Sequence, residues 1–148
     1  MKGMQRLAGD DRGSTLLLTM FYAALSLALI LVVVAATSLY LERKRLFTLA
    51  DGASLVGAEA FSLDDVKQTS AGFRPTLTSP EVAGAVAEYL ADNPADSFTR
   101  LQVDRAVSVD GRSATVELSC DWAPPVVTLF VPRGLHIRVT SIARSVFS

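Results

Sequence analysis

The sequence predicts an α+β protein, in which a long N-terminal transmembrane helix extends into a small domain with a second helix and an antiparallel sheet of three to four strands. Two observations predict this class. The 29 residues of segment 13–41 carry no charge and are followed by Glu-Arg-Lys-Arg. From residue 101 onward, apolar and polar residues alternate on both sides of an Asp-Gly pair, which is typical of a β-hairpin.

The uncharged segment is long enough to cross a bilayer. At about 1.5 Å per residue its helix would reach ~43 Å, against a hydrocarbon core of ~30 Å. Tyr22 and Tyr40 bracket its most apolar part, as aromatic residues do at membrane interfaces. A cleaved signal peptide is the alternative, with small residues at Ala36 and Ser38, but its apolar region would span only about 7–15 residues. We therefore expect an uncleaved anchor.

The charges that flank this segment do not set its orientation, because three cations lie on each side. Long domains translocate with little regard to charge, which favours a C-terminal domain outside the cytoplasm. A domain that stays in the cytoplasm is the alternative. The expected organisation is a short cytoplasmic N-terminus (1–12), a transmembrane helix (13–41), a juxtamembrane helix (42–61) and an extracytoplasmic α+β domain (62–148).

The helix is expected to continue beyond the basic residues, either unbroken or after a kink. Small and apolar residues recur there at steps of three and four, which predicts an amphipathic stripe. This stripe is a candidate contact face for a partner protein, or else it packs on the chain's own domain. Asp51, beside it, is either an exposed carboxylate or the partner of a cation in a neighbouring subunit. The candidate contact residues are Leu46, Leu49, Ala53, Val56, Gly57 and Ala60.

A second helix is predicted from residue 79 to Asn93-Pro94, after a largely polar loop over 62–78 that holds one or two short elements. Ser79 is the expected cap with Pro80 at the first helical position, and a capping box of Thr78 with Glu81 is the alternative.

Four strands follow the second helix in the prediction. Asp110-Gly111 should form the turn of a hairpin whose apolar residues all lie on one face, with Arg105 as an exception. The segment 126–132 is a third candidate strand and 135–145 a fourth. The residues expected to face the core are Leu101, Val103, Val107, Val109, Ala114, Val116, Leu118, Cys120, Trp122, Leu135, Ile137, Val139 and Ala143.

The sequence offers little for catalysis. Its 14 basic and 15 acidic residues nearly balance, which does not indicate nucleic-acid binding. Its one histidine, His136, is expected on the polar face of its strand, and its one cysteine, Cys120, on the apolar face. We find no motif for a nucleophile, a phosphate or a metal. We therefore expect no enzyme, no cofactor, no metal site and no small-molecule substrate.

The first sixty residues resemble TadE/TadG-like proteins of the tight-adherence (Flp, type IVb) pilus system, and more closely their TadG-like branch. The similarity rests on Arg12-Gly13 before the apolar helix and on Ala50-Asp51-Gly52-Ala53-Ser54-Leu55 after the basic residues. The end of the chain, 132–148, is loosely similar to the closing strand of that family. One departure is Leu18, the fifth residue after Gly13, where processed prepilins carry glutamate.

This resemblance implies an accessory, pseudopilin-like component of Flp/Tad pilus assembly or secretion that acts by contact with other Tad proteins. It would be a single-pass protein of the cytoplasmic membrane, with its N-terminus inside. The alternative is a secreted or anchored binding module without a role in pili.

Overall fold

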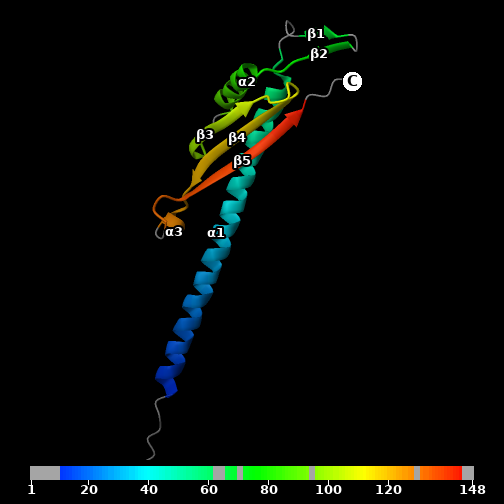
Figure 1. Cartoon of the computed structure of the whole chain (residues 1–148). Coiled ribbons are helices and arrows are strands. Elements are labelled where there is room, and N and C mark those ends of the chain that lie inside the picture. Colours follow the sequence, from blue (N-terminus) through cyan, green and yellow to red (C-terminus); the bar gives the residue numbers. More distant parts are fainter. Residues whose placement is uncertain (1–10, 62–65, 70–71, 94–95, 129–130, 145–148) are drawn as a thin grey trace, which may run out of the picture. The chain divides into compact units, whose positions relative to one another are not determined.

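A computed structural model describes residues 11–61, 66–69, 72–93, 96–128 and 131–144. The chain is α+β, as predicted, and divides into two compact units, Met1–Thr37 and Ser38–Ser148. Figure 1 shows its elements in chain order: α1 (Asp11–Glu59), β1 (Val66–Thr69), β2 (Gly72–Pro75), α2 (Ser79–Asp92), β3 (Thr99–Val107), β4 (Ser113–Trp122), α3 (Pro125–Thr128) and β5 (Leu135–Arg144).

The helix α1 is unbroken over 49 residues, so the alternative with a kink is excluded. Within the first unit its long apolar side chains are exposed, and its polar ones bond back to the helix. Thr19 Oγ1 donates to the carbonyl of Thr15 at 2.8 Å, and Thr37 Oγ1 to that of Val33 at 2.9 Å. Its most apolar 18-residue window has a mean hydropathy of 2.6, so α1 is long and apolar enough to cross a membrane.

The second unit is built on an antiparallel sheet in the order β3-β4-β5. Leu118 of β4 lies opposite Val139 of β5, and Cys120 lies opposite Ile137, so these side chains share one face. That face carries the core, as the alternation predicted. Its buried apolar residues are Ala114, Val116, Leu118, Cys120, Trp122, Ile137, Val139 and Ala143.

The prediction for β3 was wrong in its second half. The register between β3 and β4 shifts between Val103 and Arg105, which indicates a β-bulge. An extra residue reverses the alternation, so Val107 pairs with Thr115 on the outer face and Arg105 pairs with Glu117. Arg105 is therefore no exception on the apolar face. Val103 is 46% exposed and Val109 is 77% exposed because β3 is an edge strand and Val109 lies in the turn.

The candidate strand over 126–132 differs from prediction where it is described, and its residues 129–130 lie outside the described residues. Residues Pro125–Thr128 form the short helix α3 instead of a strand, because the amides of Val127 and Thr128 bond to the carbonyl of Pro124, each at 3.0 Å. The polar segment before α2 contains the hairpin of β1 and β2, which agrees with the one or two short elements expected there. Its residues 62–65 and 70–71 lie outside the described residues. Leu135 is 42% exposed at the start of β5 and does not join the core.

Thr78 is the N-cap of the second helix, which begins at Ser79. This is the cap that the alternative prediction named. The Glu81 carboxylate accepts hydrogen bonds from Thr78 N at 2.9 Å and from Thr78 Oγ1 at 2.7 Å. Ser79 is not the cap: its hydroxyl bonds to the carbonyl of Ser108 at 3.1 Å and ties α2 to the end of β3. Val82 and Val86 point into the core.

Candidate functional site

Residues 38–59 of α1 lie lengthwise along the apolar face of the sheet. Trp122 Nε1 donates to Ser38 Oγ at 3.3 Å at one end of β4, and Gly57 lies against Ala114 at the other. Nineteen helical residues rise ~28 Å and eight strand residues ~27 Å, so the two segments match in length. The helix is therefore antiparallel to β4, and its motif residues are fixed against particular strand positions.

Asp51 is a junction between α1 and β5. Ser141 Oγ donates to Asp51 Oδ1 at 3.0 Å, and the hydroxyl of Ser54 lies 3.1 Å from that of Ser141. Ser54 is fully buried and Ser141 nearly so, while the Asp51 side chain reaches the surface. Burying two hydroxyls is tolerated only when they are hydrogen-bonded, so this chain of contacts satisfies the polar atoms inside the helix–sheet packing.

Two glycines let other elements approach α1 closely. A Cβ at Gly57 would lie 3.2 Å from Ala114 Cβ and 3.2 Å from Val82 Cγ1, which is tighter than ordinary packing. A Cβ at Gly52 would meet the hydroxyl of Tyr89 on α2. The small residues of α1 thus allow β4 and α2 to pack on it.

The predicted contact residues divide between the core and the surface. Leu46 and Ala53 are fully buried and Gly57 is buried, so the chain's own sheet and α2 cover them and they do not face a partner. Leu49 and Ala60 are half-buried, and Val56 is 37% exposed. The alternative, packing on the chain's own domain, describes the centre of the stripe.

The open side of α1 carries apolar residues that the stripe did not include. Phe47 is 47% exposed and Leu55 is 53% exposed, and both join Val56 outside the core. We call these three residues the open α1 face. Sequence reasoning missed Phe47 and Leu55 because they lie off the small-residue stripe. The sequence did hold a signal for them, because both residues are apolar although they lie at helix positions outside the stripe, where polar residues are expected.

Arg12 and Gly13 lie in the first turn of α1, which begins at Asp11.

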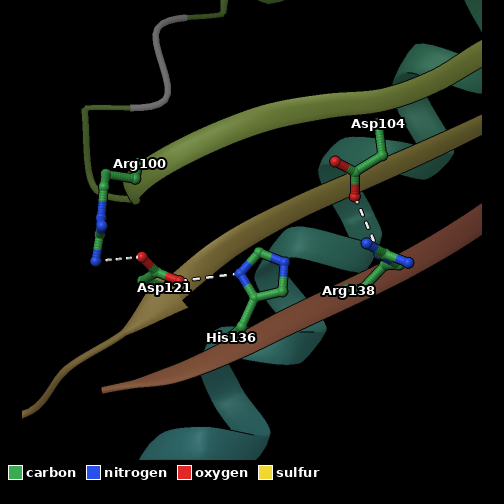
Figure 2. Close-up of polar contacts among 5 residues, drawn as sticks. All are labelled: Arg100, Asp104, Asp121, His136 and Arg138. Atoms are coloured by element: carbon green, nitrogen blue, oxygen red, sulfur yellow. Dashed lines mark hydrogen bonds and ion pairs between the residues drawn. The ribbon is translucent and has the colours of Figure 1, made fainter. Parts of the chain in front are cut away.

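The outer face of the sheet is polar, and Figure 2 shows the contacts among Arg100, Asp104, Asp121, His136 and Arg138. The Asp121 carboxylate contacts Arg100 and lies 2.9 Å from His136 Nδ1. Arg138 Nε lies 3.1 Å from Asp104 and 3.2 Å from Glu117. His136 is thus on the polar face, as predicted, and Arg138 is shared between the carboxylates of Asp104 and Glu117.

Cys120 lies on the opposite face from His136, which separates the two groups that a Cys–His dyad would need together. Burial raises the pKa of the Cys120 thiol to about 11, and the negative charges of Glu42 and Asp121 act in the same direction. The thiol therefore stays protonated and unreactive near neutral pH. Within the described ranges, no group of three or more His, Cys, Asp or Glu side chains could hold a metal ion.

Residues 13–60 match the family model "Putative Flp pilus-assembly TadE/G-like". The matched segment is about a third of the chain and coincides almost entirely with α1. It contains Gly13, the Asp51 junction and both closely packed glycines. Neither the curated proteins nor the solved structures contain a significant match to the chain. The description of that family names Flp pilus assembly, and this is what segment 13–60 is similar to.

Proposed function

We propose that the chain is a membrane-anchored accessory of Flp/Tad pilus assembly or secretion, pseudopilin-like, that acts by protein–protein contact. The observation that carries this proposal is the coincidence of the family match with α1, whose apolar part suits a bilayer. In this proposal segment 13–41 spans the cytoplasmic membrane and residues 42–61 form the juxtamembrane helix. The first twelve residues stay inside and the domain over 62–148 lies outside.

The surface that we propose for contact is the open α1 face, Phe47, Leu55 and Val56, with Leu49 and Ala60 at its margins. Phe47 and Leu55 lie about 80° apart around the helix, and Val56 lies at the other margin of the exposed side, about 180° from Phe47. Exposed apolar side chains of this kind are candidates for cover by another apolar element. Asp51 lies on this exposed side between Phe47 and Leu55, and it could also pair with a cation of a neighbouring Tad protein.

A reporter that is active only outside the cytoplasm, fused after Ser148, tests the anchoring and the orientation together. We expect a full-length, membrane-bound and active fusion that alkaline carbonate does not extract. A short soluble product would favour the alternative of a secreted module. A full-length but inactive fusion would place the domain in the cytoplasm and overturn the orientation.

Deletion of the chain in a cell that assembles Flp pili tests the role itself. We expect loss of surface pili and their return when the intact chain is supplied. Normal piliation after the deletion would contradict a role in assembly and leave a binding module without one.

A further inference from the structure

One end of the second unit combines exposed apolar and basic side chains. At this end β4 finishes at Trp122, and Leu135 begins β5 directly opposite it. Val131 is 39% exposed, Leu135 is 42% exposed, and Arg133 lies exposed between them. We call Val131, Arg133 and Leu135 the domain rim. Figure 1 shows α3 at the end of the sheet where β5 begins, and Val131 and Arg133 belong to the connection between these two elements.

The hydrogen bond between Trp122 and Ser38 fixes which part of α1 lies beside the rim. Ser38 belongs to the uncharged segment 13–41 and precedes its last residue by three positions. At 1.5 Å per residue, Ser38 lies only about 4–5 Å along the helix from Leu41. The domain therefore starts beside the last turn of the uncharged segment and not beyond it.

The residues that follow have the chemistry of a headgroup layer. Arg43, Lys44 and Arg45 are exposed and lie about 3–6 Å beyond Leu41 along the helix. The headgroup region on each side of a bilayer is of that thickness, roughly 5–7 Å. Tyr40 is 65% exposed and Leu41 is 48% exposed at the same level. If the hydrocarbon ends at Thr37, Tyr40 and Leu41 lie about 4–6 Å beyond it, within the headgroup layer. The rim, which lies beside Ser38, is then level with the boundary between acyl chains and headgroups.

We propose that the domain rim docks on the surface of the bilayer that holds α1, and that the surface it fits is anionic. Val131 and Leu135 enter the boundary between headgroups and acyl chains, while Arg133 and the three cations of α1 contact lipid phosphates. The nearest carboxylates do not oppose this, because Asp121 is neutralised by Arg100 and Glu42 is half-buried against the domain. This inference rests on the proposed membrane anchoring, and it adds that the domain lies in contact with the membrane surface.

Cysteine-attached labels near the two ends of β5 test it in the full chain reconstituted in vesicles. Leu135→Cys places an environment-sensitive fluorophore at the rim, and Ile142→Cys places the same label at an exposed site ~23 Å along the strand. Both side chains are exposed, so neither substitution disturbs the core. The native chain labelled under the same conditions is the control for Cys120, which is buried.

In vesicles that mix phosphatidylcholine and phosphatidylglycerol, we expect iodide to quench the label at 135 several-fold less than the label at 142. Lipids brominated near the headgroup should quench only the label at 135. Equal quenching of both labels by iodide, in protein that alkaline carbonate does not extract, would overturn the docking and leave the anchor intact. Protein that carbonate extracts would instead contradict the proposed anchoring.

The proposed preference for an anionic surface is tested with a variant that combines Leu135→Cys with Arg43→Gln, Lys44→Gln and Arg45→Gln. We expect the protection at 135 to rise when phosphatidylglycerol is added to phosphatidylcholine, and to rise less in the triple variant. Protection that is the same in both vesicle types would overturn the preference for an anionic surface.

Discussion

The hydroxyl of Ser141 donates a hydrogen bond to the carboxylate of Asp51 at 3.0 Å and joins β5 to α1 across 90 positions of sequence. Asp51 belongs to the segment that resembles the TadE/G-like family, so a residue of that motif holds the chain's own helix to its sheet. Hydrogen bonds to charged groups contribute about 1.5–3 kcal/mol where they are shielded, and less where water reaches them.

We expect Ser141→Ala to lower the free energy of unfolding by about 1–2 kcal/mol, because it removes this bond and leaves the buried hydroxyl of Ser54 with one partner fewer. Urea unfolding of the full chain in detergent measures the change. Thr140→Ala, on the exposed side of the same strand, is the control and should change it by no more than about 0.5 kcal/mol. Equal effects of the two variants would contradict the role of Ser141.

Gly57 and Gly84 are expected to respond in opposite directions to a larger side chain. Gly57→Leu should destabilise the domain by about 1–3 kcal/mol or more, because Ala114 and Val82 leave no room beside it. Gly84→Ala on α2 has nothing within 4 Å of the added Cβ and should stabilise by about 0.5–1 kcal/mol. Thermal unfolding compares them, and a stable Gly57→Leu variant would show that the helix does not pack as described.

The turn between β3 and β4 depends on an ionised carboxylate. Asp110 Oδ1 accepts hydrogen bonds from the amides of Arg112 and Ser113 and from the Ser113 hydroxyl, which lowers the pKa of Asp110 to about 2. Because the folded pKa lies below the ordinary 3.8, the turn gains stability above that pH and loses it as pH falls towards 2. An NMR titration should place the Asp110 midpoint near 2, and a midpoint near 4 would contradict these bonds.

Cys120 is expected to resist alkylation in the folded chain. With a pKa of about 11 instead of 9.0, its thiolate fraction at pH 8 is about a hundredfold lower than in an unfolded chain. The raised pKa favours the folded state at neutral pH, and this contribution declines as pH rises above 9. The rate of reaction with a maleimide, with and without urea, measures the difference, and equal rates would mean that the thiol is not buried.

The sequence predicted the features that depend on local pattern. An uninterrupted apolar segment predicted α1, and the strict alternation from Ala114 to Trp122 predicted the buried face of β4. Positions that depend on a single backbone irregularity were not predictable. The bulge between Val103 and Arg105 reverses the second half of β3, and nothing in the residues marks it.

The short helix α3 and the exposure of Leu135 also differ from prediction, and each has a physical cause that the alternation of apolar and polar residues does not reveal. Pro125 fits the first turn of a helix, and this outweighed the β-branched residues that follow it. Leu135 has an apolar side chain at a core-facing register, but it lies at the end of the sheet where little covers it.

A stripe of small residues does not say which surface covers it, so the sequence left open whether the candidate contact residues pack on a partner or on the chain's own domain. Leu46, Ala53 and Gly57 pack on the chain's own domain, and that choice depends on the sheet that forms later in the sequence. Which side of α1 remains exposed therefore depends on where the sheet packs, and the residues of α1 alone do not determine this.

Photo-crosslinking from the open α1 face tests the central claim most directly, since it asks whether this surface meets a partner in cells that assemble pili. A photoreactive amino acid would replace Leu55, with Ile142, equally apolar and also exposed, as the matched control. The account predicts a crosslink from position 55 to another pilus-assembly protein, identified by mass spectrometry, and none from position 142. A chain that is present in the membrane but forms no such crosslink from position 55 would contradict it.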